Sequence, residues 1–357
     1  MKDQSITIQL TEQKNVIPPA STLQFGRTFT DHMFIMDYTK GQGWHDARIV
    51  PYGPLSLDPA SMVLHYGQTV FEGLKAYVTK DGVAQLFRPT KNIERLNRSN
   101  DRLCIPEIDE DFALKAIRKL VEIDQEWIPN QPGTSLYIRP FVISTQPYLG
   151  VAASEMYSFI VILSPVGPYY KEGINPVKIA VEDIYVRAVV GGTGEAKTGG
   201  NYAASLKAQE KTEDKGFAQV LWLDGVERNY IEEVGSMNVF FNIDDKIVTP
   251  QLSGSILDGV TRNSVITLLN DWDIEVEERK ISMDELYDAY KRGALKEAFG
   301  TGTAAVISPI GQLTWKQEDL ILNHYETGPI AKRLYDTLTG IQYGDVEDRF
   351  GWIVPVE

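Results

Sequence analysis

The chain has 357 residues, of which 43% are hydrophobic and 24% charged, and its formal net charge is −14 at pH 7. This length and composition are typical of a globular protein with a large hydrophobic core and predict two domains. The acidic excess argues against nucleic acid and anionic membrane surfaces as partners, because phosphate binding requires clustered Lys and Arg.

The numbers and positions of cysteine and histidine limit the kinds of site that the chain can form. Cys104 is the only cysteine, so no intrachain disulfide forms, as expected in a reducing compartment. The histidines (His32, His45, His65 and His324) are scattered without a zinc-binding spacing, so no metal site is predicted. No signal-like segment and no run long enough to span a membrane is present. We therefore expect a cytoplasmic protein.

The first half of the chain is rich in strand signals. An Asp81-Gly82 turn predicts a β-hairpin between two apolar runs. Other runs of β-branched and aromatic residues are also predicted as strands, and residues 1–30 as an extended arm. The predicted strands are 34–36, 74–78, 83–87, 135–143 and 157–163, and a short helix is expected to begin near 58–61.

Two helices are predicted among these strands. Thr90 is predicted as the N-cap of a helix that places Ile93 and Leu96 on one side. Asp109 can cap a second helix, because apolar residues recur at helical spacing from Phe112 to Val121.

Residues 164–173 are rich in Pro and Gly, which break both periodicities, and are predicted to link two domains. We expect a smaller N-terminal α/β domain over 1–163 and a larger C-terminal cofactor-binding domain over 174–357. In the second domain strands are predicted at 177–181, 217–223, 238–243, 246–249 and 274–279, and helices at 202–211, 261–270, 327–338 and after the capping box 282–285.

One lysine in the second half has an unusual setting. Lys197 lies between the glycine-rich run 191–194 and Gly199-Gly200, and glycine allows a backbone to approach a ligand closely. Such a site suits a lysine that forms a covalent imine, although a flexible surface loop with an ordinary lysine has the same composition. A nucleotide-binding P-loop is excluded, since Ala196 precedes the lysine where that motif requires glycine.

Two further segments can bind anions. Residues 300–305 match G-x-G-x-x-A, but a strand-like run stopped by Pro309 follows where a dinucleotide fold needs a helix. This turn is either an anion-binding nest or a tight β-turn. Residues 258–262 open a helix, and the amides of Val260 and Thr261 either bind phosphate or simply begin a capped helix.

The adjacent acids Glu232 and Glu233 precede an apolar strand. They are either a solvated turn or include a carboxylate that holds a heterocyclic nitrogen in its protonated form, since a negative charge favours the cation.

Six blocks follow one another along the chain: 25–33 (FGRTFTDHM), 65–66 with 71–76 (HY, FEGLKA), 135–140 (SLYIRP), 197–202 (KTGGNY), 233–238 (EVGSMN) and 300–305 (GTGTAA). With these blocks the chain resembles the branched-chain amino-acid aminotransferases. They are fold-type IV pyridoxal-phosphate enzymes of the class IV aminotransferase family. The resemblance implies a two-domain α/β fold (α+β mixed), with the cofactor in the cleft between the domains.

The resemblance implies a role for each cofactor-binding position. Lys197 would bind pyridoxal 5′-phosphate covalently and move the substrate's proton, and Glu233 would pair with the pyridine nitrogen. Tyr202 would hydrogen-bond the cofactor's phenolic oxygen. The phosphate would be held by Arg95, by the amides of Val260 and Thr261, and by Thr303.

The substrate positions are also implied by the resemblance. Aromatic residues would line the side-chain pocket, Arg139 and tyrosine hydroxyls would meet the distal carboxylate of glutamate, and two further groups would bind the α-carboxylate. The aromatic positions are Phe25, Tyr66, Tyr137 and Tyr169, and the α-carboxylate positions are Ser236 and the Ala304 amide. Arg139 and the tyrosines are alternatively structural residues.

The resemblance implies reversible transamination of L-leucine, L-isoleucine and L-valine with 2-oxoglutarate. It also implies a homodimer in which each active site takes residues from the partner's loop around Gly150 and Val151. Two alternatives within the same fold are a D-amino-acid transaminase and an aminodeoxychorismate lyase. A binding protein that keeps the fold without catalysis is a third, which the presence of Lys197, Tyr202 and Glu233 opposes.

Overall fold

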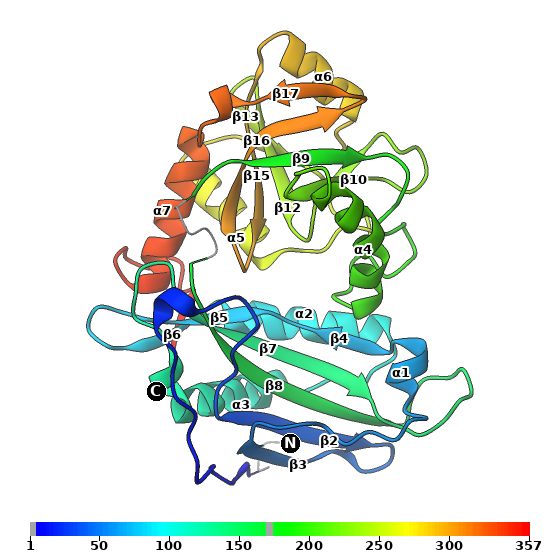
Figure 1. Ribbon diagram of the computed structural model, residues 1–357, viewed down its shortest axis with the longest axis vertical. Coiled ribbons are helices and arrows are strands. Elements are labelled where there is room, and N and C mark those ends of the chain that lie inside the picture. The colour runs from blue at the N-terminus through cyan, green and yellow to red at the C-terminus, as the bar shows by residue number, and fades with distance from the viewer. Residues whose placement is uncertain (1–4, 169–173) are drawn as a thin grey trace. The chain divides into compact units, whose positions relative to one another are not determined.

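Two mixed β-sheets organise the chain, one in each of two units of the computed structural model (Figure 1). The structure describes residues 5–168 and 174–357. Unit 1 comprises Met1–Tyr169, Ala196–Gly199 and Gly340–Glu357, and unit 2 comprises Tyr170–Glu195 and Gly200–Thr339. The predicted α/β (α+β mixed) fold class is therefore confirmed.

The sheet of unit 1 has the strand order β1-β3-β2-β8-β7-β5-β6-β18 among the described residues, and β4 pairs with β7. Its strands are β1 (Thr7–Ile8), β2 (His32–Thr39), β3 (Gly43–Pro51), β4 (Thr69–Phe71), β5 (Leu74–Val78), β6 (Ala84–Phe87), β7 (Ser135–Ser144), β8 (Met156–Val166) and β18 (Ile353–Pro355). Its helices are α1 (Met62–Tyr66), α2 (Pro89–Arg102) and α3 (Glu110–Ile123), with short 3₁₀ turns at Ala20–Thr22 and Gln125–Trp127.

Helices α2 and α3 share one core with the sheet of unit 1. Leu96 of α2 and Leu120 of α3 are buried together with Leu136 and Ile138 of β7. Side chains alternate along a strand, so Tyr137 and Arg139 lie on the opposite face of β7. This second face is the one on which the sequence places candidate substrate residues.

The sheet of unit 2 has the order β11-β10-β9-β16-β15-β12-β13-β14 among the described residues, and β17 pairs with β16. Its strands are β9 (Val177–Glu182), β10 (Gln219–Leu223), β11 (Ile231–Val234), β12 (Asn238–Ile243), β13 (Lys246–Thr249), β14 (Val276–Glu278), β15 (Leu295–Gly302), β16 (Val306–Trp315) and β17 (Glu318–Ile321). Its helices are α4 (Gly199–Glu213), α5 (Val260–Asp271), α6 (Met283–Lys291) and α7 (Pro329–Tyr343), with a 3₁₀ turn at Asn323–Tyr325.

Two local predictions are wrong for identifiable reasons. Helix α2 begins at Pro89 after Arg88, because proline fits the first helical position, so Thr90 is not its N-cap. Strand β16 does not stop at Pro309, which pairs with Phe299 of β15. The pairing of β16 with β9 begins only at Ile310, so the missing N–H of Pro309 costs no bond on that side.

The units differ from the predicted domains in three respects. Residues 164–166 of the predicted linker belong to β8, and residues 169–173 lie outside the described residues. The segments Ala196–Gly199 and Gly340–Glu357 cluster with unit 1. Unit 1 is consequently the larger of the two, whereas the sequence predicted a smaller N-terminal domain.

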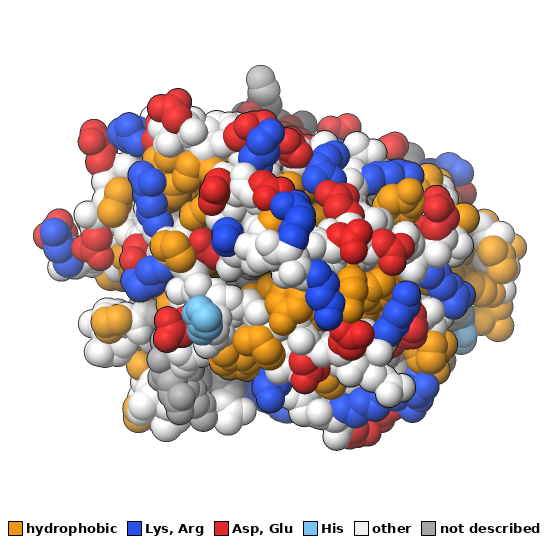
Figure 2. All heavy atoms as spheres, turned by 90° about the horizontal axis from the view of Figure 1, so that it is seen from above, with side chains coloured by type: hydrophobic (Ala, Val, Ile, Leu, Met, Phe, Trp, Pro, Cys, Tyr) orange, Lys and Arg blue, Asp and Glu red, His pale blue; other side chains and the backbone are white. Residues whose placement is uncertain are grey.

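The surface carries charged side chains of both signs. Figure 2 shows Lys and Arg side chains interspersed with Asp and Glu over the face in view. Lys246 pairs with Glu275 and Lys291 with Glu318 in this manner. None of the helices in the described residues has the length and apolar character needed to cross a membrane.

Candidate active site

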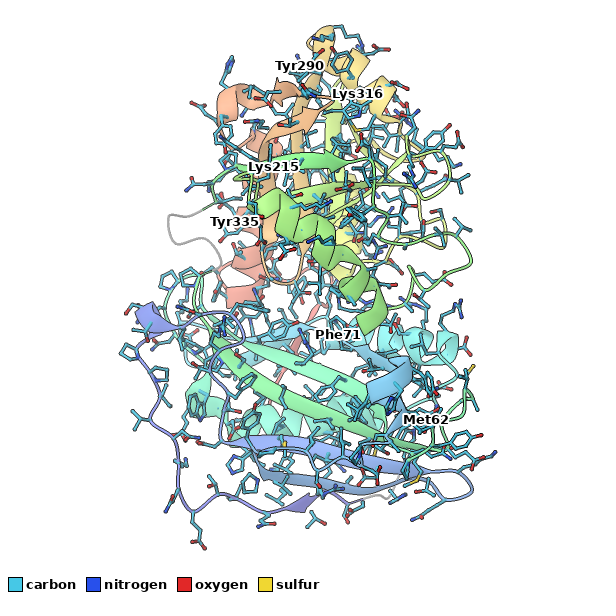
Figure 3. All side chains as sticks on the ribbon, turned by 45° about the vertical axis from the view of Figure 1, so that its right-hand side comes forward. Met62, Phe71, Lys215, Tyr290, Lys316 and Tyr335 are labelled. Carbon is cyan, nitrogen blue, oxygen red and sulfur yellow. The ribbon has the colours of Figure 1, made fainter. Side chains whose placement is uncertain are left out.

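Lys197 is fixed against β4 in unit 1 by its own backbone. Its carbonyl accepts the Phe71 N–H (2.9 Å), its N–H donates to the Ser99 hydroxyl (2.9 Å), and the following Thr198 bridges to Val70. The Lys197 amine lies 5.0 Å from the centre of the Phe71 ring, which Figure 3 labels on β4. Lys197 therefore lies on an ordered edge of unit 1 and not on a flexible surface loop.

Aromatic rings and one arginine surround the same Phe71. The Arg139 guanidinium lies 4.7 Å from the Phe71 ring and 5.3 Å from the Tyr137 ring, and donates to the Tyr137 hydroxyl (3.0 Å). The Phe25 ring meets Tyr137 edge to face at 4.8 Å. A Cβ on Gly73 would lie 2.1 Å from the Tyr137 hydroxyl, so this packing requires glycine there.

Arg95 forms a buried ion pair with Glu72, the residue after Phe71. Its Nε and Nη2 donate to the two carboxylate oxygens at 2.7 and 2.9 Å, and the Asn92 amide adds a bond of 2.9 Å. Burial raises the pKa of Glu72, but the charges of Arg95 and Lys197 and the hydrogen bonds outweigh it, so that pKa is lowered. Glu72 is thus a carboxylate within electrostatic reach of both cations.

Helix α2 presents these groups to β4 from one face. Arg95 and Ser99 are four residues apart, and this spacing puts both side chains on the same side of a helix. Arg95 reaches Glu72, and Ser99 reaches the backbone of Lys197. The helix therefore places the Arg95 guanidinium one turn from the serine that anchors the lysine backbone.

Two other predicted substrate residues are less enclosed. Phe25 is 48% exposed and Tyr66, at the end of α1, is 41% exposed. The Tyr66 hydroxyl donates to the Leu149 carbonyl. Tyr169 lies outside the described residues.

In unit 2, the loop before the lysine is held by α4. The Asn201 amide donates to the Thr193 carbonyl and accepts from the Thr193 hydroxyl, both at 2.7 Å. Gly194 packs so closely that a Cβ would lie 2.3 Å from the Ser255 carbonyl. Tyr202 follows Asn201 in the first turn of α4 and is half-buried.

Glu232 and Glu233 are buried in β11, so the solvated-turn interpretation is wrong. One oxygen of Glu233 accepts the Leu257 N–H (2.8 Å), and the other lies 3.3 Å from Nε of Arg187. A carboxylate that is 3% exposed keeps its charge only with such partners.

Three predicted groups of unit 2 converge on Asn238, the first residue of β12. Its side-chain amide donates to the Leu257 carbonyl (2.9 Å), its backbone pairs with Thr301, and a Cβ on Gly259 would lie 2.0 Å from its side-chain oxygen. Leu257 in turn binds Glu233, and Gly259 is the N-cap of α5. The groups brought together are Glu233, the α5 amides of Val260 and Thr261, and the turn that carries Thr303 and Ala304.

Ser236 belongs to the same cluster. It lies in the turn between β11 and β12, next to Met237, which bridges back to Val234. A Cβ on Gly300 or Gly302 would lie close to the Met237 side chain, at 3.0 and 3.1 Å respectively. The Ser236 turn therefore packs against the glycine–threonine turn.

The α5 N-terminus has the chemistry of an anion site. Its N-cap is Gly259, which has no side chain to bind the first N–H groups. Those groups and the helix dipole favour a negatively charged ligand.

Sequence reasoning missed four residues of this arrangement: Phe71, Glu72, Ser99 and Arg187. The first two lie inside a recognised block, and the spacing of Ser99 from Arg95 was a usable signal. Arg187 has no local motif, because its partner Glu233 is remote in sequence.

Known proteins resemble the whole chain. The family model "amino-transferase class IV" matches residues 69–313. "Branched-chain-amino-acid aminotransferase 2" of Bacillus subtilis (strain 168) is 65% identical over 356 residues, covering 100% of this chain and 98% of the relative.

Solved structures agree in fold. The branched-chain aminotransferase of Thermoproteus uzoniensis with norvaline has a TM-score of 0.77 at 27% identity and covers 91% of this chain and 100% of its own. The branched-chain amino acid aminotransferase of Escherichia coli has a TM-score of 0.73 at 27% identity, covering 91% of this chain and 99% of its own. The chain therefore belongs to the class IV aminotransferase family.

Proposed function

We propose that this protein transfers amino groups reversibly between branched-chain L-amino acids and 2-oxoglutarate. The products are branched-chain 2-oxo acids and L-glutamate. The relatives' names support this substrate class over the full length of the chain. The observation that carries the proposal is Lys197, anchored on β4 with its amine over Phe71, while Arg139 and Tyr137 flank the same ring.

We propose pyridoxal 5′-phosphate as the cofactor, which supplies the electron sink for charge at the substrate's α-carbon when bound. The residues of unit 2 fit such a group, because the uncapped amides of Val260 and Thr261 suit a phosphate. By resemblance to the family, Arg95 and Thr303 would also bind the phosphate. Glu233 is a buried carboxylate suited to a protonated ring nitrogen. Tyr202 would donate to the phenolic oxygen.

The chain's own residues would then handle the substrate. Lys197 would take the proton from the substrate's α-carbon and deliver it to C4′ of the cofactor, which is general acid–base work. Ser236 and the Ala304 amide hold the α-carboxylate. Phe25 and Tyr137 offer apolar contact to a branched side chain, and the Arg139–Tyr137 pair offers charged donors to the distal carboxylate of glutamate.

Borohydride reduction of the cofactor-loaded protein tests the lysine. Mass spectrometry should find the reduced cofactor on Lys197. Lys197→Ala should lose the label and slow turnover by on the order of 10²–10⁴-fold, through loss of the base alone. The control Lys207→Ala removes an exposed lysine paired with Glu210 on α4, and it should keep both the label on Lys197 and the turnover. A label on another lysine would refute the assignment.

A substrate panel separates this function from its alternatives. With 2-oxoglutarate as acceptor, L-leucine, L-isoleucine and L-valine should react and their D-enantiomers should not. Preferential turnover of D-amino acids would indicate a D-amino-acid transaminase, and pyruvate release from aminodeoxychorismate would indicate a lyase. Cofactor binding without any turnover would indicate a binding protein.

We also propose a homodimer, on the basis of apolar residues on unit 1. The loop after β7 is tied to α1, because Tyr148 N–H donates to Ala60 (3.0 Å) and Ser61 bridges to Pro147. Together the loop and helix form an apolar surface, termed the α1 patch, made of Leu64, Tyr66, Tyr148, Leu149 and Val151, which are 41–86% exposed. Exposed apolar groups gathered in this way are typical of interfaces.

A further inference from the structure

Strand β11 carries a β-bulge at its two acids. Trp222 of β10 pairs with Glu233, but the next residue, Leu223, pairs with Ile231, so Glu232 is an extra residue in β11. A bulge re-aims the side chains at its position and is frequent beside active sites.

The bulge leaves both carboxylates facing one segment. The Ser255 hydroxyl donates to Glu232, and the Leu257 N–H donates to Glu233 at 2.8 Å. Glu232 is 6% exposed and Glu233 is 3% exposed. The two adjacent acids are therefore buried in one environment. Keeping both carboxylates ionised there is unfavourable in free energy, because of burial and mutual repulsion.

Arg187 is fixed beside this pair. The Arg187 side chain is 8% exposed, and its Nε lies 3.3 Å from a Glu233 oxygen. Its Nη2 donates to the Ser255 carbonyl and to the Gly194 carbonyl at 3.5 Å. The guanidinium is thus anchored to the segment before α5 and to the loop before Lys197.

The two acids differ in how they are compensated. Burial raises the pKa of Glu232, and the charge of Glu233 adds to this, while Ser255 and Arg187 oppose it, leaving the pKa raised. Within the described residues, the second oxygen of Glu232 has no hydrogen-bond partner. Burial and the neighbouring charge therefore disfavour ionisation of Glu232, whereas Glu233 has the Leu257 N–H and the Arg187 guanidinium as close partners.

We propose that Arg187 is the positioning residue for Glu233: it keeps that carboxylate ionised and fixed, so that it can pair with the ring nitrogen of the cofactor. This inference rests on the proposed function. It assigns a role to a residue outside the six recognised blocks.

The test uses two ligands of the apoprotein. One is pyridoxal phosphate, and the other is its 1-deaza analogue, in which a C–H replaces the ring nitrogen. Tryptophan fluorescence quenching measures both dissociation constants. Arg187→Met should weaken pyridoxal phosphate binding by about 10-fold or more, because Glu233 loses the positive charge beside it, and leave the analogue unchanged.

Further variants test whether Arg187 acts on cofactor binding through Glu233. Glu233→Gln should show the same selective loss, and the double variant should be no worse than Glu233→Gln alone. Arg187→Lys should recover part of the loss, because it retains the charge. Turnover of the loaded Arg187→Met enzyme should fall by on the order of 100-fold. The control Arg279→Met removes a partly exposed arginine paired with Glu285 and should change the dissociation constant of neither ligand.

Three outcomes overturn the inference. If Arg187→Met weakens both ligands equally, or if the two substitutions add, Arg187 is merely structural while the proposed function stands. If the wild-type apoprotein binds neither ligand, the proposed function fails and takes this inference with it. Where Arg187→Met does not fold, Arg187→Lys is judged by the same selectivity between the two ligands.

Discussion

Glu72 shows how a single buried carboxylate is kept charged in unit 1. It is 1% exposed and accepts hydrogen bonds from Arg95, Asn92 and its neighbour Gly73. These bonds and the nearby amine of Lys197 offset the cost of burial. The pair also joins β4 to α2, so it supports the candidate site and the core together.

Removing the Glu72 carboxylate should therefore unfold the protein more easily. Glu72→Ala leaves the Arg95 guanidinium buried without its partner, and we expect the free energy of unfolding to fall by about 3–5 kcal/mol. Urea denaturation of apoprotein measures this change. The control Glu155→Ala breaks an exposed pair with Lys40 and should change little. Wild-type stability in Glu72→Ala would contradict the ion pair's role.

The lowered pKa of Glu72 also predicts how the stability of the protein changes with pH. Because the pKa of Glu72 is lowered in the folded state, its contribution is complete above the ordinary value of 4.5 and is lost as the pH falls below it. Glu72→Gln, which has no charge to lose, should accordingly show a shallower loss of stability on acidification.

Residue roles were predictable only where the signal is local or belongs to a recognised block. Glycines on both sides marked Lys197, and the blocks marked Tyr137 and Arg139. The partner of Arg95 is 23 residues away, and no local pattern announces that pairing. Buried ion pairs form through tertiary packing, which a single sequence does not display.

At the scale of elements, locally encoded boundaries were predicted well. Asp109 accepts from the Phe112 N–H (2.9 Å) as the N-cap of α3, and Ser282 accepts from Glu285 (3.1 Å) at α6. The β5–β6 hairpin is also where its Asp-Gly turn placed it. Strands such as β4, β15 and β18 were missed, since long-range pairing defines them and their own sequences are short or contain glycine.

Helix α7 depends on a cap supplied by a distant strand. Glu297 of β15 accepts the N–H groups of Ile330 (3.2 Å) and Ala331 (3.1 Å) in the first turn of α7. Glu297→Ala would leave these donors, one buried and one partly buried, without acceptors, and we expect a loss of about 1–3 kcal/mol in the free energy of unfolding.

Chemical denaturation followed by circular dichroism measures that loss. Glu297→Gln retains an acceptor oxygen and should lose less. Asp336→Ala, which removes an exposed partner of Lys332 on the same helix, serves as the matched control. Equal stability of Glu297→Ala and wild type would show that α7 needs no cap from β15.

At the scale of the whole molecule, the α1 patch predicts association. Val151 is 86% exposed, and burial of such a group against a second copy contributes through the hydrophobic effect. Val151→Asp should shift the protein toward monomer in sedimentation velocity. Val83→Asp places the same charge at a residue that is 51% exposed in the β5–β6 turn and should leave the dimer intact. A wild-type monomer at micromolar concentration would exclude the dimer.

The division into units was the hardest feature to predict. Pro and Gly content pointed to 164–173, yet β8 extends to Val166, and the tail from Gly340 returns to unit 1. Composition marks where periodicity stops but not where a tail goes afterwards. The return depends on the pairing of β18 with β6 and on the packing of Trp352 against Phe87 and Arg88.

That returning tail affects the order in which the protein can fold during synthesis. Strand β18 pairs with β6, and the Val356 N–H donates to Ala84 (3.0 Å), so the edge of the first sheet is made from residues translated far apart in time. Residues 174–195 and 200–339 of unit 2 emerge from the ribosome before this edge is available. Unit 2 can therefore finish its sheet first. The N-terminal unit has β6 unpaired on one side until β18 has been made, and such an open edge is prone to aggregation.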